Sequence, residues 1–122
     1  MRILKKSFRR HVESSRLGET VAFYERLEGV ACERRIRIEQ AGIDVALVGD
    51  FIILAGPETV ISTLRGVQAT FTVDSLDEFV AALPAQGAEL MSAPKSSAAG
   101  RNATVRHPDG LVVEYYESSS PR

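Results

Sequence analysis

The chain has 122 residues, of which 44% are hydrophobic and 25% are charged, and its formal net charge is −1. This length suffices for one compact domain with its own core, and the composition is ordinary for a soluble globular protein. The near-neutral charge excludes the broad basic field that attracts nucleic acid, and no run of about 18 apolar residues predicts a membrane span. The single Cys32 excludes an intramolecular disulfide framework and fits a reducing cytosol, so we expect a cytoplasmic protein without nucleic-acid or membrane partners.

The first half of the sequence predicts a strand, a helix and three more strands. Residues 3–12 are typical of a strand, and LGETVAFYERLEG has apolar residues at helical spacing up to a closing glycine, Gly29. In ACERRIRIEQ, Ile36 and Ile38 alternate with charged residues, which indicates a half-buried strand. IDVALV and DFIILAGP follow as two strands joined by a Gly-Asp turn. Residues 3–56 therefore predict a first βαβββ module, linked to the next by residues 57–66.

The second half, residues 67–117, repeats this order. GVQATFTV alternates between apolar and polar residues, and SLDEFVAALPAQG predicts the second helix of the chain, opened by a capping box of Ser75 and Glu78. AELMSAP, RNATVRH and GLVVEYY predict three strands, the last two joined by the turn HPDG. In that turn His107 is interpreted as a turn residue that hydrogen-bonds the backbone. Residues 118–122 are polar and are predicted to fray.

Internal duplication indicates the architecture more firmly than any single element. We expect one α+β domain, residues 1–122, built from two tandem βαβββ modules whose sheets curl around a central cleft. The apolar face of each sheet would pack on its helix, and the other face would line the cleft. Residues 92–101, SAPKSSAAGR, are consistent with a lid or with an ordinary hairpin loop.

Three segments carry a family resemblance: FYERL on the first helix, VDSLDEF before the second, and GRNATVRHPDGLVVEYYE at the end. With the duplicated layout, they make residues 3 to 117 similar to the glyoxalase, bleomycin-resistance and extradiol-dioxygenase superfamily, also called vicinal oxygen chelate proteins. The resemblance implies a small-molecule ligand in the cleft and a two-fold homodimer. A fold hosts many activities, so it does not decide the reaction.

Enzymes of this superfamily usually hold a divalent metal on residues of the first and last strand of each half, in the pattern His…Glu…His…Glu. Glu114, four residues after the glycine of the HPDG turn, matches the last of these positions. Its counterpart in the first half, from aligning DFIILA with GLVVEY, is Leu54, which has no donor atom. The corresponding position on the first strand of the second half is Gln68, whose amide oxygen is a weak ligand.

The first strand allows two registers. One places Arg9 at the ligand position, with His11 and Glu13 on the same face; the other places Phe8 there, beside Arg10. A catalytic metal site needs about three protein ligands and an open position, and an arginine would repel the cation. These departures from the superfamily's pattern predict no resident metal, and no other cofactor is expected; if a metal is bound, its ligands are His11, Gln68 and Glu114. Glu114 is then expected to pair with Arg9, Arg10 or a ligand.

Two functional hypotheses follow. The first is a metal-free small-molecule-binding protein that is similar to the bleomycin-resistance type and holds a metabolite or antibiotic. The second is a lyase, isomerase or dioxygenase, metal-dependent or using His11 and Glu114 as acid and base. Whether the protein is an enzyme stays open here. Tyr116 is included in the site because it shares a strand face with Glu114. The predicted ligand-binding residues are Arg9, His11, Leu54, Gln68, Thr70, Glu114 and Tyr116.

Overall fold

The computed structural model describes residues 1–97 and 99–119. The chain divides into two compact units: Ser7–Gly66, here called the early unit, and Met1–Lys6 together with the chain from Val67 onward, here called the late unit. Strand β1 (Ile3–Glu13) contributes to both, because the boundary falls between its Lys6 and Ser7.

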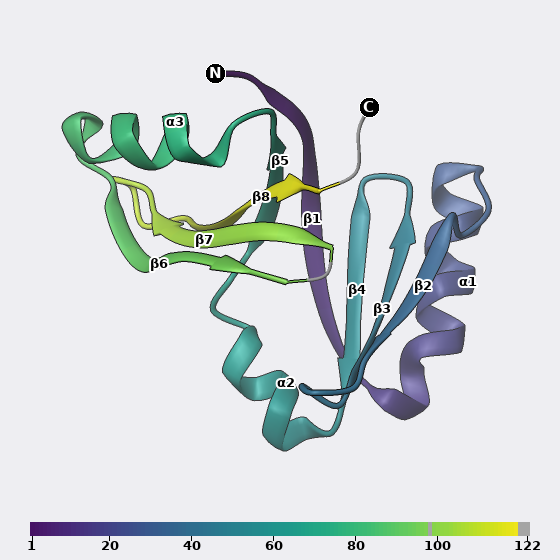
Figure 1. Cartoon of the computed structure of the whole chain (residues 1–122). Coiled ribbons are helices and arrows are strands. Elements are labelled where there is room, and N and C mark those ends of the chain that lie inside the picture. The colour runs from purple at the N-terminus through teal and green to yellow at the C-terminus, as the bar shows by residue number, and fades with distance from the viewer. Residues whose placement is uncertain (98, 120–122) are drawn as a thin grey trace. The chain divides into compact units, whose positions relative to one another are not determined.

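The early unit has the strand order β2-β3-β4-β1. Strand β1 runs parallel to β4, whereas β4, β3 and β2 pair antiparallel. Two α-helices belong to this unit, and α1 follows a short 3₁₀ turn, Ser14–Arg16 (Figure 1). The elements after β1 are α1 (Leu17–Glu28), β2 (Arg34–Ile38), β3 (Ile43–Val48), β4 (Phe51–Gly56) and α2 (Glu58–Leu64).

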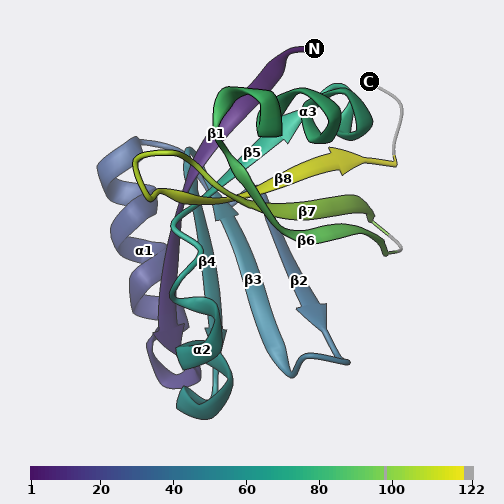
Figure 2. The same ribbon diagram turned by 90° about the vertical axis from the view of Figure 1, so that its left-hand side faces the viewer.

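Two apolar clusters lie on opposite faces of this sheet. Val21 of α1 packs on Ala46, Val48 and Ile53. Ile61 of α2 packs on the other face, in a cluster whose buried members also include Ile43, Val45 and Leu54. Strand residues alternate between faces, so β3 and β4 are apolar on both and carry the near-continuous hydrophobic runs seen in their sequence. Both helices lie beside β4 and β1 in Figure 2.

The late unit has the strand order β1-β5-β8-β7-β6, with β5 parallel to β8. Its elements after β1 are β5 (Ala69–Val73), α3 (Leu76–Ala82), β6 (Glu89–Ser96), β7 (Gly100–Arg106) and β8 (Val112–Ser118). Helix α3 begins where the Ser75 hydroxyl accepts a hydrogen bond from the Glu78 N–H at 3.3 Å, and a 3₁₀ turn, Leu83–Gln86, extends it. The predicted N-terminal cap is confirmed at this residue.

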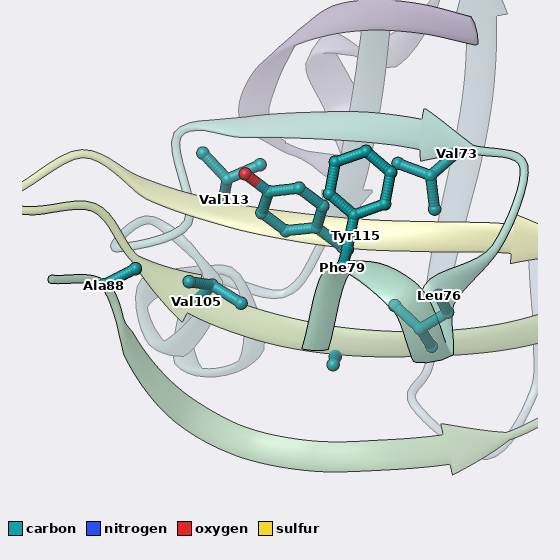
Figure 3. Close-up of a cluster of buried hydrophobic side chains, with 8 residues drawn as sticks. Val73, Leu76, Phe79, Ala88, Val105, Val113 and Tyr115 are labelled. Carbon is teal, nitrogen blue, oxygen red and sulfur yellow. The ribbon is translucent and has the colours of Figure 1, made fainter. Parts of the chain in front are cut away.

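The core of the late unit lies between α3 and one face of its sheet. Leu76 and Phe79 of α3 pack on Val73, Val113 and Tyr115, with the Phe79 and Tyr115 rings 5.5 Å apart (Figure 3). This face is the apolar face that the alternation in GVQATFTV predicts. Burial of such side chains contributes about 1.5–3 kcal/mol each.

The predicted α+β class, with two modules of βαβββ order, is confirmed. The expectation of only two helices is wrong, because the link 57–66 contains α2. Its Val60, Ile61 and Leu64 recur at helical spacing and pack on the early sheet, a pattern too short to stand out in the sequence.

Most of the segment 92–101, expected to be a lid or an ordinary hairpin loop, belongs to the strands of a hairpin, since β6 reaches Ser96 and β7 begins at Gly100; residue 98 lies outside the described residues. Ser97 N–H donates to the Gly100 carbonyl at 2.7 Å, which closes the turn. In the predicted frayed tail, Ser118 ends β8, and residues 120–122 lie outside the described residues. Within the described ranges no helix is long and apolar enough to span a membrane.

Candidate functional site

Strand register fixes which side chains share the face of the early sheet opposite α1. His11 pairs with Leu54 and Arg9 pairs with Ile52. The pairing continues across the sheet, so two rows of side chains run over four strands. The first row is Ile36, Val45, Leu54 and His11, and the second is Arg34, Leu47, Ile52 and Arg9.

This arrangement selects one of the two registers left open by the sequence. Phe8 contacts Phe51, which stacks on Tyr24 of α1 with ring centroids 4.1 Å apart, so Phe8 lies on the α1 face. Arg9 and His11 therefore face the other way and share a face with Leu54. The register that puts Phe8 and Arg10 on that face is wrong.

The environment of His11 is basic and partly dehydrated. Burial first, and then the positive charges of Arg9, Arg65 and Arg10, lower the pKa of His11 from 6.5 to about 4. His11 is therefore neutral at pH 7. Among the described residues its Nε2 atom is buried and has no hydrogen-bond partner. A neutral imidazole in a positive field, with a ring nitrogen to spare, is suited to contact a polar ligand group.

Arg9 and Arg65 bring positive charge to His11 from two elements. Arg9 lies on β1 and is 8% exposed. Arg65 follows α2, and its guanidinium binds the Glu58 carboxylate through two N–H groups, one of them 3.0 Å from Oε1. Sequence reasoning missed Arg65, because its neighbourhood depends on α2, which was expected to be a link. Leu54, 6% exposed, supplies only apolar surface beside these groups.

The corresponding face of the late sheet is polar. Thr70 pairs with Glu114, and its hydroxyl donates to Glu114 Oε1 at 3.2 Å. Thr104 pairs with Glu114 from the other side. A second row holds Asn102, Tyr116 and Thr72. Glu114 is thus half-buried on a strand whose other residues are mainly apolar. The hydroxyl groups on the same face of the sheet offset part of the free-energy cost of removing its carboxylate from water.

Two of the predicted site residues already have local partners in the late unit. The Gln68 Oε1 atom accepts the N–H of Val112 at 3.1 Å, so the atom that would bind a metal holds the backbone. The Tyr116 hydroxyl donates to the Ala99 carbonyl at 2.8 Å and holds the β6–β7 hairpin. Tyr116 shares its face with Glu114, as the alternation predicted, while Tyr115 lies in the core.

His107 is a turn residue, as the sequence suggested, and its side chain has a second role. Its backbone N–H does bond the Leu111 carbonyl at 2.8 Å, which closes the HPDG turn. Its ring also reaches the core, where Nε2 lies 2.7 Å from the Tyr115 hydroxyl. Burial raises the pKa of Tyr115. The His107 ring therefore provides the hydrogen-bond partner of the buried Tyr115 hydroxyl group.

The predicted site residues thus lie on two sets of strands. Within the early unit the fold brings together Arg9, His11 and Leu54; within the late unit it brings together Thr70, Glu114 and Tyr116. The pairing of Glu114 with an arginine stays a prediction. Within the described ranges no three His, Cys, Asp or Glu side chains are grouped so that they could hold a metal ion.

The two βαβββ modules define a fold that methylmalonyl-CoA epimerase also has, and that enzyme is a member of the vicinal oxygen chelate superfamily. The enzyme from Mycobacterium tuberculosis matches with a TM-score of 0.69 at 17% identity, over 97% of this chain and 90% of that one. A Streptomyces coelicolor epimerase variant in complex with 2-nitronate-propionyl-CoA matches with a TM-score of 0.63 at 19% identity, over 98% and 99%. Likenesses at this identity show the fold alone.

A solved structure of an uncharacterised protein from Methanosarcina mazei is much more similar. It shares 39% identity with a TM-score of 0.88, over 100% of this chain and 98% of that one. The chain belongs to the same family as the Methanosarcina mazei protein. No protein-family model and no curated protein sequence matches the chain.

Proposed function

We propose that this chain is a small-molecule-binding protein of the vicinal oxygen chelate fold that works without a resident metal ion. The observation that carries the proposal is the His11–Leu54 pair on β1 and β4. The corresponding strands of the late unit, β5 and β8, carry the Thr70–Glu114 pair, which includes a carboxylate. The early unit therefore offers apolar surface and arginines at a position where a metal ligand would be needed.

The chemistry of the donor groups supports a metal-free site. Leu54 has no donor atom, and Gln68 Oε1 is engaged with the backbone N–H of Val112. His11 has a free ring nitrogen, but three arginines act on it and would repel a divalent cation. A transition-metal or zinc site needs about three protein ligands, and these residues do not fit one. The predicted absence of a cofactor remains part of this proposal.

The test is to purify the protein without chelator, measure its metal content, and screen metabolites and antibiotics by thermal shift with and without EDTA. A ligand that binds only the folded state raises stability by RT ln(1 + [L]/Kd). We expect metal well below stoichiometry and ligand-induced shifts that EDTA does not change. Stoichiometric metal, with ligand shifts that disappear in EDTA, would contradict the proposal.

A second candidate is an isomerase, favoured by the epimerases among the proteins of similar fold. In such a reaction a base removes the proton from a carbon next to a carbonyl group, and an acid returns a proton to the other face. His11 is neutral at pH 7 and can accept a proton, and Glu114 is the other candidate group. Incubating methylmalonyl-CoA with the protein in D₂O separates the two functions: deuterium at the α-carbon that His11→Gln abolishes indicates an isomerase.

We further propose that the protein forms a homodimer, as the resemblance to its superfamily implies. Sedimentation at tens of micromolar tests this directly. A particle of 13.3 kDa would contradict it, and one of twice that mass would support it.

A further inference from the structure

We propose that the early unit recognises an amphipathic anion, a carboxylate or phosphate group on an apolar body, and that Arg9 and His11 hold the anionic group while Ile36, Leu47 and Ile52 contact the apolar part. This inference rests on the proposed binding function and names its ligand class. The residues involved come from the two rows of side chains on the face opposite α1.

The apolar part of this face is only partly covered. Ile61 of α2 packs against Leu54 and Val45, which are 6% and 9% exposed. Ile36, Leu47 and Ile52 lie in the same rows but stay half-buried. Side chains that have left part of their surface in water gain free energy when an apolar group covers them. An apolar ligand body of a few carbon atoms therefore finds a matching surface here.

The polar groups that the proposal uses lie at the β1 end of both rows, whereas Arg34, the β2 member of the second row, is exposed at the opposite end. Arg9 and His11 are the β1 members, next to Ile52 and Leu54 respectively. The charges that act on His11 are those of Arg9, Arg65 and Arg10. Arg65 is bound to Glu58 on α2, so part of its charge is offset locally. The Nε2 atom of His11 is buried without a hydrogen-bond partner among the described residues. In the tautomer that has its proton on Nε2, the neutral ring can donate a hydrogen bond to an anionic oxygen.

An anion fits this group better than a neutral or cationic ligand. A buried guanidinium forms its strongest hydrogen bonds with carboxylate and phosphate oxygens, in two-pronged geometry. A cationic ligand would add to the positive charge at His11 and would be repelled. The same groups would bind a carboxylate or a phosphate, so the ligand class is defined by the anionic head and the apolar body together.

The experiment measures the affinity of the intact protein for a matched series of probes by calorimetry at pH 6.5. The series comprises butyrate, hexanoate and octanoate, the uncharged octanamide, the cationic octylamine, and butyl phosphate with inorganic phosphate. We expect affinity to rise several-fold with each added pair of methylene groups, and octanamide and octylamine to bind at least tenfold more weakly than octanoate. Butyl phosphate compared with butyrate identifies the preferred head group.

Variants then locate the site. Arg9→Gln should weaken octanoate binding at least tenfold, whereas Arg35→Gln should leave it within about twofold, since Arg35 is exposed on β2 and pairs with Ala46, whose side chain packs on α1. If Arg9→Gln does not fold, the site is located instead by NMR, from the histidine ring signals of the natural protein during titration with octanoate. Octanoate should shift the signals of His11 and leave those of His107, which is held by Tyr115.

Three results would overturn the inference. One is equal binding of octanoate, octanamide and octylamine, which leaves a metal-free binding protein without charge selectivity. Another is an octanoate site whose affinity Arg9→Gln does not change and whose occupancy does not shift the His11 signals. The third is no binding of any anionic probe at millimolar concentration. The proposed function fails separately, through stoichiometric metal and ligand binding that EDTA abolishes.

Discussion

The two units share one order of parts, yet the corresponding faces of their sheets have opposite chemistry. In the early unit His11 pairs with Leu54 near three arginines, and the middle of both rows is apolar as far as the exposed Arg34 on β2. In the late unit Thr70 pairs with Glu114, beside Thr104 and further polar residues. The faces that pack on α1 and α3, by contrast, are apolar in both units. These two cores share the duplicated layout, whereas the opposite faces differ in chemistry, and α2 covers part of the opposite face in the early unit.

The largest expected effect comes from giving the early unit the residue of the late unit. Leu54→Glu places a carboxylate where a side chain is 6% exposed and contacts the Ile61 cluster. We expect a loss of about 3 kcal/mol in the free energy of unfolding, because burial of the charge outweighs its attraction to nearby basic groups. Urea unfolding measures the loss.

The matched control for this exchange is Leu54→Met, which conserves volume and should cost less than about 1.5 kcal/mol. If Leu54→Glu proved as stable as the natural protein, the early face would be shown to accept an acid readily, and the contrast between the units would not be set by burial.

A smaller effect concerns pH. His11 has a pKa of about 4 in the folded protein against 6.5 unfolded, so between these values the unfolded chain binds more protons. The folded state therefore loses stability as the pH falls from 6.5 toward 4. Because the side chain is half-buried, we expect His11 to contribute about 1–2 kcal/mol of this loss.

The variant His11→Gln removes this contribution and leaves the carboxylates unchanged. Comparing its unfolding free energy with that of the natural protein at pH 7 and pH 4.5 isolates the histidine. A pH dependence identical in both proteins would contradict the shifted pKa of His11.

Tyr115→Phe tests the core that packs on α3 in the late unit; the early unit has Ala55 at the corresponding position. The change removes the hydroxyl 2.7 Å from His107 Nε2 and leaves the ring packed against Phe79. We expect a cost of about 1 kcal/mol, the value of one hydrogen bond, measured by thermal unfolding. His107→Phe offers the reverse test, and the double variant should cost less than the sum of the two if the residues act as a pair.

The smallest expected effect is at Glu114. Glu114→Gln keeps the volume and can still accept from the Thr70 hydroxyl, so the free energy of unfolding should change by no more than about 1 kcal/mol. Glu114→Leu copies Leu54 of the early unit and removes the charge. Melting temperatures of both variants, with and without chelator, measure the change in stability. A drop of many degrees in both, independent of chelator, would show instead that Glu114 is a structural ion-pair residue.

Much of this organisation could be predicted from local sequence signals. Alternation in GVQATFTV placed Thr70 on the face away from the core, and the spacing of Glu114 and Tyr116 placed them together on β8. Gly29 ends α1 with φ of 69°, a left-handed conformation that glycine adopts without strain. These features depend on neighbours a few residues apart, so a sequence contains them directly.

Other features depend on strand pairing, on helix packing or on contacts between distant residues. The register of β1 follows from parallel pairing with β4, which sets His11 opposite Leu54 and excludes Phe8 from that face. The short helix α2 gains its stability by packing on the early sheet, since an isolated seven-residue helix is marginal. The bond from Gln68 to the backbone joins residues 44 positions apart.

The sequence by itself determined the α+β class, the duplicated βαβββ order and the presence of Leu54 as the counterpart of Glu114, because periodicity and residue type are properties of short segments. Only the tertiary structure decided that Arg9, Arg65 and Arg10 act together on His11 and lower its pKa, and that Gln68 and His107 are bound within the protein. The reason is physical. Electrostatic and hydrogen-bond energies depend on distances between atoms far apart in the chain, which are set when strands and helices pack.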